Sequence, residues 1–203
     1  MILVRAPFRI PLGGGGTDLP SYYSKFGGSL ISVAINKYMI VNANRPVIDD
    51  LIRLKYSTSE TVERINQVQH PLVKEALKLT KVSKAVELSW IADVPHGTGM
   101  GSSGSFLVAT LKALHTLAGR EVTAQRIAEE ACYIEMDVLK SPVGKQDQYL
   151  AAFGGLTQLE IDRKGRVEVS KPKVSLAILK DLESSFVLFY TGINRSSHQV
   201  LSK

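Results

Sequence analysis

The sequence has a single cysteine, Cys132, among its 203 residues, so no internal disulfide bond can form. It begins with a strand-like pattern, Met1 to Arg5, and lacks the charged, apolar and small-residue order of a signal peptide. No apolar run is long enough to cross a bilayer. These absences argue against a disulfide-stapled secreted domain and a membrane-spanning protein, and they predict a cytoplasmic protein with no membrane partner.

Aromatic residues make up only 7% of the chain, and no basic run is interleaved with them. Dedicated nucleic-acid binding is therefore disfavoured, although the formal net charge is +6. The positive balance either favours anionic ligands, phosphorylated substrates among them, or is simply a solvated surface. Hydrophobic residues (44%) and charged residues (22%) have the ordinary proportions of a globular domain, without internal repeats.

Glycines and serines are concentrated between Pro95 and Ser105, after a strand-like run (85–94) and before a helical run (106–118). Glycines let the backbone approach a ligand closely, and a helix start offers unpaired N–H groups and a positive dipole end. Ser102 and Ser103 stand at this start, where a hydroxyl can cap the helix, contact a phosphate or bind Mg²⁺. A glycine-rich turn with a capping serine is the simpler interpretation, but the coincidence of these features favours a phosphate-binding loop.

Two well-known phosphate loops fit this stretch poorly. No lysine follows Gly101 or Gly104, as the Walker pattern requires. Gly99 to Gly104 matches Gly-x-Gly-x-x-Gly, but four residues separate it from the strand, whereas the dinucleotide fingerprint follows its strand directly. A dinucleotide-dependent oxidoreductase is therefore only a distant alternative.

A second glycine cluster, Gly13 to Gly16, precedes Thr17 and Asp18. Four consecutive glycines lose much conformational entropy on folding, so a ligand or a close backbone contact must compensate for them. Asp18 can accept hydrogen bonds from sugar hydroxyls, or it can form an Asx turn or a helix N-cap. The local sequence leaves these roles open.

Further candidate groups lie in the second half of the chain. Glu135 lies among small apolar residues of a helix that Thr123 caps, and it is either a metal or substrate ligand or a solvent-facing helical residue. The turn Ser141 to Gly144 leads to Lys145 and Asp147, whose proximity would favour the ionised carboxylate.

Periodicity and turn signals predict alternating strands and helices. We expect strands over 2–10, with Pro7 at an edge or bend, 29–43, with an interruption at 36–37, 52–56, 85–94, 156–161, 167–169 and 186–190. We expect helices through most of 58–80, over 106–118, over 123–139, and from 193 onward.

Phosphoryl transfer needs a cradle for nucleotide phosphates, ligands for Mg²⁺, and a group that orients or deprotonates the attacking hydroxyl. Ser102, Ser103 and Glu135 offer hard oxygen ligands for the metal. Asp147 can act as the base, and Arg9 can stabilise charge on the transferred group. The residue types thus allow a kinase.

Three segments resemble motifs of the GHMP kinases, the small-molecule kinase superfamily of galactokinase, homoserine kinase, mevalonate kinase and phosphomevalonate kinase. They are 5–18, 95–103, and Glu135 together with Gly144-Lys145-Gln146-Asp147-Gln148. The second is similar to the family's phosphate-binding motif. The three motifs occur in the family's order, and the resemblance spans nearly the whole chain.

The resemblance implies a set of site residues. Asp147 would be the catalytic carboxylate with Arg9 as its basic partner, and Ser103 and Glu135 would hold Mg²⁺. ATP would be bound by Pro95, Gly97, Thr98, Gly99, Met100, Gly101, Ser102 and Ser103, and the sugar by Gly15, Gly16, Thr17 and Asp18.

Within the superfamily, the stretch from Gly13 to Asp18 differs from the Gly-Glu-His-Thr-Asp of galactokinases. Together with 144–149 and 189–192, it is most similar to D-glycero-D-manno-heptose 7-phosphate kinases and the related L-fucose kinases. The implied reaction uses ATP and Mg²⁺ to phosphorylate the anomeric hydroxyl of the heptose 7-phosphate, giving the 1,7-bisphosphate. A kinase for L-fucose or galactose, and a catalytically incomplete nucleotide- or sugar-binding protein, are the alternatives.

The implied fold is α+β, the N-terminal domain of GHMP kinases, which is similar to domain 2 of ribosomal protein S5 and has a mixed sheet covered by helices. We expect this ATP-binding domain over 1–170 and the start of a C-terminal α/β domain over 171–203. No segment matches the family's third glycine-rich motif, so the chain resembles the N-terminal lobe with the start of the next. A homodimer is left open.

Overall fold

The computed structural model describes residues 1–189 and residue 192. Its strands are β1 (Ile2–Gly13), β2 (Gly28–Asn44), β3 (Ile52–Lys55), β4 (Ser59–Val62), β5 (Val86–Ala92), β6 (Leu156–Ile161) and β7 (Val167–Ser170). Its helices are α1 (Pro20–Phe26), α2 (Pro71–Thr80), α3 (Ser102–Leu117), α4 (Ala124–Cys132), α5 (Gln146–Phe153) and α6 (Leu176–Ser185), with a 3₁₀ turn η1 (Ile65–Gln67) and a π-helical turn η2 (Tyr133–Val138). Over the described ranges, no helix has the length and apolar character needed to span a membrane.

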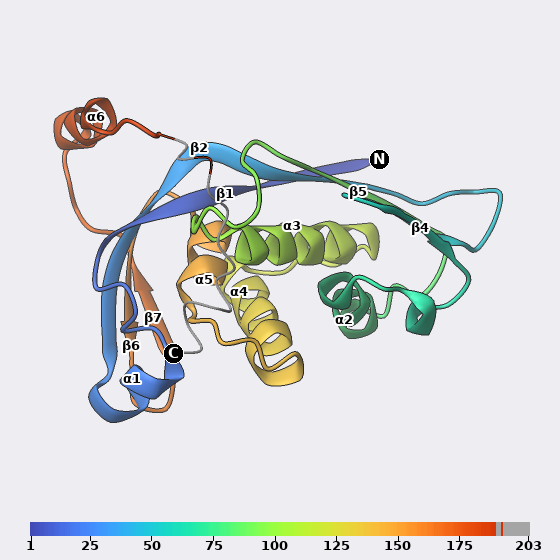
Figure 1. Ribbon diagram of the computed structural model, residues 1–203, viewed down its shortest axis with the longest axis horizontal. Coiled ribbons are helices and arrows are strands. Elements are labelled where there is room, and N and C mark those ends of the chain that lie inside the picture. Colours follow the sequence, from blue (N-terminus) through green and yellow to red (C-terminus); the bar gives the residue numbers. More distant parts are fainter. Residues whose placement is uncertain (190–191, 193–203) are drawn as a thin grey trace.

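The strands form one seven-stranded sheet in the order β4-β3-β5-β2-β6-β7, with β1 paired to the other edge of β2. β3 and β5 run parallel, and the remaining pairs are antiparallel. Helices α2, α3, α4 and α5 lie together on one face of the sheet (Figure 1). This confirms the α+β fold with a mixed sheet covered by helices.

Strand β2 organises the sheet because it pairs with three others. Residues 39–44 pair with β5 and residues 28–33 with β6, while β1 follows the opposite edge. The register slips between Pro7, opposite Tyr38, and Arg9, opposite Ala34. The expected interruption of β2 at 36–37 is therefore a bulge within one continuous strand, which re-aims the residues that follow it in β1. The backbone N–H of Arg9 reaches the Met100 carbonyl at 3.2 Å, so the bulge brings β1 to the glycine-rich loop.

The hydrophobic core lies between the sheet and α3. Strand residues Phe8, Val41 and Leu88 belong to one cluster with Leu107 and Leu111 of α3, and each is at most 1% exposed. Removing one leucine side chain from such a core costs about 2–5 kcal/mol. This packing fixes α3 against the sheet, and with it the loop that precedes α3.

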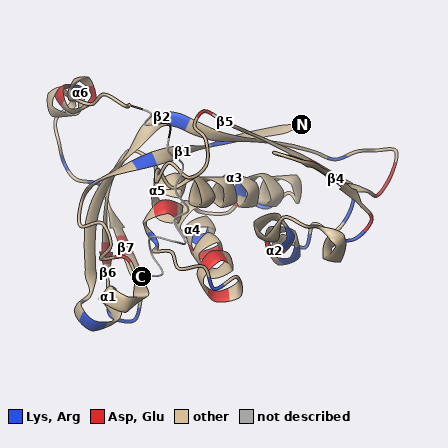
Figure 2. Cartoon of the chain, in the orientation of Figure 1, with Lys and Arg blue, Asp and Glu red and all other residues tan. Residues whose placement is uncertain are grey.

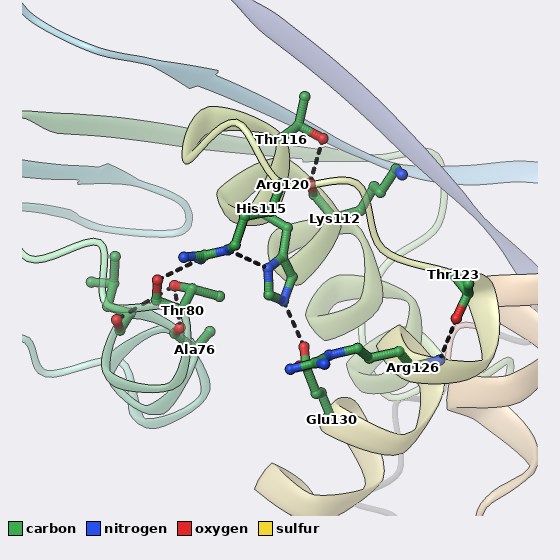
Figure 3. A network of polar contacts seen from close by, with 10 residues as sticks. Ala76, Thr80, Lys112, His115, Thr116, Arg120, Thr123, Arg126 and Glu130 are labelled. Carbon is green, nitrogen blue, oxygen red and sulfur yellow. Dashed lines mark hydrogen bonds and ion pairs between the residues drawn. The ribbon is translucent and has the colours of Figure 1, made fainter.

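The far end of α3 is tied to its neighbours by a polar network around His115 (Figure 3). Arg120 Nε donates to His115 Nδ1 at 3.1 Å, and an arginine can only donate, so His115 Nε2 carries the proton and donates to Glu130 at 2.6 Å. Arg120 also donates to the Thr80 carbonyl at 2.6 Å, and Arg126 donates to Glu130 at 2.8 Å. The network therefore joins α2, α3 and α4 with both ring nitrogens satisfied.

Several predicted elements need correction. Helix α3 begins at Ser102, four residues before the expected start, and its N-cap is Gly101 without a side-chain hydrogen bond. Ser102 and Ser103 are therefore in the first turn and do not cap the helix. The first part of 58–80 is not helical, because it contains β4, and the α-helix of this range begins only at Pro71, after η1. By contrast, Thr123 caps α4 as predicted, its side chain accepting from Arg126 N.

The region after β7 differs most from the prediction. Residues 186–189 form no strand, and α6 precedes them instead. α6 has no buried residue and lies outside the helical layer (Figure 1). Tyr190, Thr191 and 193–203, which include the end of the expected strand and the last expected helix, lie outside the described residues. The proposed boundary at residue 170 remains a prediction.

Candidate active site

The N-terminus of α3 lies directly against the first turn of α5. A Cβ added to Gly104 would lie 2.6 Å from Asp147 Cβ, and one added to Gly101 would lie 3.0 Å from Asp147 Cγ. Gly101 is also in the left-handed region, with φ 77°. Glycine at both positions thus allows two helix N-termini to meet at Asp147, and each presents unpaired N–H groups and a positive dipole end.

Asp147 forms an ion pair with Arg9 across 138 residues of sequence. Arg9 Nε and Nη2 both contact Asp147 Oδ1, at 2.7 and 2.5 Å. The third nitrogen, Nη1, donates to the Gly99 carbonyl at 2.8 Å. Among the described residues no hydrogen bond involves Asp147 Oδ2, and the side chain remains 24% exposed. One carboxylate oxygen is held by arginine and the other is free to accept a proton from a ligand.

The pKa of Asp147 is raised above its ordinary value, because desolvation by burial outweighs the opposing effect of Arg9. The charge and hydrogen bond of Arg9 lower the pKa of Asp147, and the charge of Asp18 raises it. The expectation that Lys145 would favour the ionised form is wrong. Lys145 donates to the Gly165 carbonyl at 2.5 Å, and the guanidinium of Arg9 has the expected role.

The predicted phosphate loop is built from left-handed glycines. Gly97, Gly99 and Gly101 have φ of 78°, 76° and 77°. A Cβ at Gly99 would meet nothing within 4 Å, so its positive φ, and not crowding, requires glycine there. The Thr98 hydroxyl donates to the Pro95 carbonyl at 3.2 Å. The expected ATP-binding residues therefore form a loop from Pro95 to Gly101, followed by Ser102 and Ser103 in the first turn of α3.

Glu135 is buried, 2% exposed, and its partner is an amide. Gln148 Nε2 donates to Glu135 Oε2 at 2.5 Å. Burial raises the pKa of Glu135, the Gln148 and Ser103 side chains lower it, and the charge of Asp147 raises it further. The interpretation of Glu135 as a solvent-facing helical residue is therefore wrong. Glu135 also lies in the π-helical turn η2, a type of irregularity that is frequent at functional sites.

A magnesium ion fits this arrangement. No salt bridge of the described chain involves Glu135, and a buried carboxylate is normally paired with a cation or a metal. Within residues 1–189, no cluster of three or more His, Cys, Asp or Glu side chains is arranged for a metal. Mg²⁺ usually needs only one or two protein ligands, because waters and substrate phosphates complete its shell. Ser103 and Glu135 meet that requirement.

The second glycine cluster forms a close backbone contact. A Cβ at Gly14 would overlap the Ser29 carbonyl, whereas one at Gly16 would meet nothing within 4 Å. Asp18 is 6% exposed and accepts from Gln146 N at 2.9 Å, so it is neither an N-cap nor an Asx turn but a link to the start of α5. A Cβ at Gly144 would overlap the Asp18 carboxylate.

Three residues of this site escaped the sequence analysis as individuals: Gly104, Gly144 and Gln148. Their neighbours in space are distant in sequence. The available signals were the position of Gly104 in the glycine-rich stretch and that of Gly144 and Gln148 in the third motif segment. The structure brings Arg9, Asp18, Asp147 and the loop before α3 together around the N-terminus of α5. Thr17 lies alongside, where its hydroxyl donates to the Gly14 carbonyl at 2.7 Å.

A cavity of about 450 Å³ lies beside this site. It is lined by residues of α1, α4, η2, α5 and the β6–β7 hairpin, among them Tyr23, Cys132, Lys145, Tyr149 and Arg166. The Lys145 ammonium lies 5.5 Å from the centre of the Tyr23 ring. Glu129 and Asp137 also line the cavity, so its charges are mixed. Over the rest of the molecule, acidic and basic residues are likewise spread over sheet and helices (Figure 2).

Comparison with known proteins shows which kinases the chain is similar to. The profile of the GHMP kinases N terminal domain matches residues 65–155. The chain is 29% identical over 213 residues to the D-glycero-alpha-D-manno-heptose 7-phosphate kinase of Campylobacter jejuni, covering 98% of this chain and 62% of the relative. It is 24% identical over 241 residues to the L-fucokinase/L-fucose-1-P guanylyltransferase of Bacteroides fragilis, covering 98% of this chain and 25% of the relative.

A solved structure gives the same result. The D-glycero-D-manno-heptose 1-phosphate kinase from Bacteroides thetaiotaomicron matches with a TM-score of 0.84 and 27% identity, over 91% of this chain and 64% of that one. The chain thus spans less than two thirds of the length of each of these relatives. Since the domain profile, the related sequences and the solved structure all agree with the fold described above, the chain contains the α+β N-terminal domain of the GHMP kinases.

Proposed function

We propose that the protein is a Mg²⁺- and ATP-dependent sugar kinase. The observation that carries this proposal is Asp147, with one oxygen bound to Arg9 and the other free, at the meeting point of two helix N-termini. Phosphoryl transfer depends mainly on positioning and on stabilising negative charge, and this arrangement supplies both. The family's members are ATP-dependent phosphotransferases, which supports the same reading.

In this proposal the loop from Pro95 to Ser103 binds the nucleotide phosphates. Its left-handed glycines and the free N–H groups at the start of α3 suit a polyphosphate. Ser103 and Glu135 would hold Mg²⁺, which when bound neutralises charge on the phosphate oxygens.

The free Oδ2 of Asp147 accepts the proton of the sugar hydroxyl as that hydroxyl attacks the γ-phosphorus of ATP in line. The P–O bond to ADP breaks in the same step, without a covalent enzyme intermediate. Arg9 keeps the Asp147 carboxylate oriented and adds positive charge beside the transferred group. Gly15, Gly16, Thr17 and Asp18 bind the sugar next to this base.

The sugar we propose is D-glycero-D-manno-heptose 7-phosphate, phosphorylated at its anomeric hydroxyl. The C. jejuni relative, which aligns with 98% of the chain, is named for that substrate, and the B. thetaiotaomicron structure is named for a heptose phosphate too. Lys145 supports a phosphorylated sugar, because it follows Gly144 at the Asp18 contact and offers further N–H donors at the adjoining cavity.

The test is ADP release with Mg·ATP and a panel of heptose 7-phosphate, L-fucose, galactose and mannose. We expect turnover on heptose 7-phosphate, and a loss of about 10²- to 10⁴-fold in Asp147→Asn with ATP binding retained. Asp181→Asn, an exposed position on α6, is the matched control and should keep its activity. Full turnover by Asp147→Asn would exclude Asp147 as the base.

A second candidate substrate is L-fucose, since the B. fragilis L-fucokinase also aligns with 98% of the chain. Turnover of fucose but not of the heptose phosphate would favour it, and Lys145→Met would then leave KM unchanged. For heptose 7-phosphate, Lys145→Met should instead raise KM, while Lys164→Met, in the β6–β7 hairpin that the Lys145 ammonium contacts, should not. If the protein binds ATP but releases no ADP with any sugar of the panel, a catalytically incomplete binding protein is favoured.

A further inference from the structure

Gln148 occupies an unusual position, next to Asp147 in sequence and bound to Glu135. It is 1% exposed, and it follows Asp147 in the first turn of α5. Its Nε2 donates to Glu135 in η2 at 2.5 Å, which links the two elements. Its own carbonyl oxygen, Oε1, is buried and has no hydrogen-bond partner in the described structure.

The orientation of this amide follows from its neighbour. Turning it over would place Oε1 against the Glu135 carboxylate, where two acceptors repel, so Nε2 must face Glu135. The unpaired Oε1 is then an unavoidable cost of burying an amide at this position. An apolar side chain of similar size would fill the space without burying an unpaired oxygen. The advantage of glutamine at this position must therefore come from the hydrogen bond that its Nε2 donates to Glu135.

We propose that Gln148 is a positioning residue that holds the Glu135 carboxylate for the divalent cation and fixes it relative to Asp147. Asp147 and Gln148 are consecutive, so one helical turn sets the distance between the base and the metal ligand. This inference rests on the proposed kinase function. Hydrogen bonds that orient metal-binding carboxylates typically change metal affinity or activity about 10- to 100-fold when removed.

A purely structural role for Gln148 makes a different prediction. A buried side chain that only fills and links the interior affects stability, and its loss does not separate metal binding from nucleotide binding. A positioning residue changes the Mg²⁺ requirement while metal-free nucleotide affinity stays the same. The two roles are therefore distinguished by a binding measurement that does not depend on catalysis.

The experiment compares the full chain with Gln148→Met, which keeps the volume and removes the donor. Gln146→Met is the matched control, because Gln146 is buried in the same turn but donates to Ser32 Oγ. ATP affinity is measured by calorimetry without metal and across a MgCl₂ titration, and Mn²⁺ binding is followed by electron paramagnetic resonance.

For Gln148→Met we expect the half-saturating Mg²⁺ concentration to rise about 10- to 100-fold, with metal-free ATP affinity within about twofold of wild type. Gln146→Met should keep the wild-type Mg²⁺ dependence. If Gln148→Met does not fold, Gln148→Asn keeps an amide too short to reach Glu135 and should show the same shift.

Wild-type Mg²⁺ dependence in a folded Gln148 variant overturns the positioning role and leaves the kinase proposal intact. An equal shift in Gln146→Met also overturns it, because the effect would then belong to the whole turn. If the wild-type protein binds ATP with no Mg²⁺ dependence at all, the kinase proposal and this inference fail together.

Discussion

Replacing Gly104 with alanine tests whether the contact between the starts of α3 and α5 positions the candidate base. The new Cβ would lie 2.6 Å from Asp147 Cβ and 3.0 Å from Gln148 N. Carbon atoms pack best at about 3.5–4.0 Å, so the two helix starts must separate by roughly 1 Å. Both neighbouring atoms belong to or adjoin the backbone of α5, so no flexible side-chain end can relieve the clash.

The expected result is a large catalytic loss with a small stability loss. Overpacking costs about 1–3 kcal/mol, and the higher helix propensity of alanine stabilises the helix by about 1 kcal/mol relative to glycine. The net loss in the free energy of unfolding should therefore be at most about 2 kcal/mol. A misplacement of about 1 Å at the reacting groups costs on the order of 100-fold in rate. The assay is ADP release with Mg·ATP and heptose 7-phosphate, beside thermal unfolding.

Thr116→Ala is the control for this experiment, because Thr116 lies near the opposite end of the same helix. It should keep full turnover. If Gly104→Ala retains wild-type turnover and unfolds at the wild-type temperature, the close contact is not needed and the argument from the glycine is refuted.

Two further predictions concern stability. His115→Ala removes the hydrogen-bond partner that the Arg120 and Glu130 side chains share, and should destabilise the fold by about 2 kcal/mol, or about 4–8 °C in Tm by calorimetry. A drop in Tm below about 2 °C would contradict the proposed role of the network. Desolvation lowers the pKa of His70, which stacks on Phe106 at 4.9 Å. The unfolded chain therefore binds the proton more readily, so wild-type stability is highest above the ordinary histidine pKa of about 6.5 and falls as pH drops through it. His70→Phe should flatten the Tm profile between about pH 7.5 and 5.5, and an unchanged slope would assign the acid sensitivity elsewhere.

The sequence predicts the site well where its evidence is local. Glycines that adopt positive φ, a strand before them and a helix after them are all visible in one window, and the loop before α3 is found as expected. The partners of that loop are not local. The Arg9–Asp147 pair spans 138 residues, and its geometry depends on the bulge that separates Pro7 from Arg9 in register.

Lys145 shows how proximity in sequence misleads. Residues at i and i+2 of a helix do not face each other, so a lysine at the N-cap of α5 points away from Asp147 in its first turn. Arg9 comes instead from β1, on the side that Asp147 faces. A favourable charge near in sequence is therefore weak evidence for an ion pair when a helix begins between the two residues.

Glu135 shows the opposite case, in which the pattern held information that the residue type obscured. Ala128, Ala131 and Cys132 are buried, and Glu135 continues their i, i+3, i+4, i+7 spacing. The spacing predicts an inward position, whereas glutamate as a type favours solvent. The structure follows the spacing, and the conflict itself marks the residue as a candidate for function.

The polar groups around His115 and around Glu135 differ in how completely the described protein supplies their hydrogen-bond and ion-pair partners. At His115 every partner is supplied by the protein: Arg120 donates to one ring nitrogen and Glu130 accepts from the other. A network whose hydrogen bonds are all made within the protein stabilises the fold and needs no ligand. At Glu135 the carboxylate has no salt bridge in the described chain, and Gln148 Oε1 has no partner. An incomplete network in an otherwise well-packed interior is costly, so it persists where a ligand completes it, and Glu135 rather than His115 is the buried polar centre at which a cation should bind.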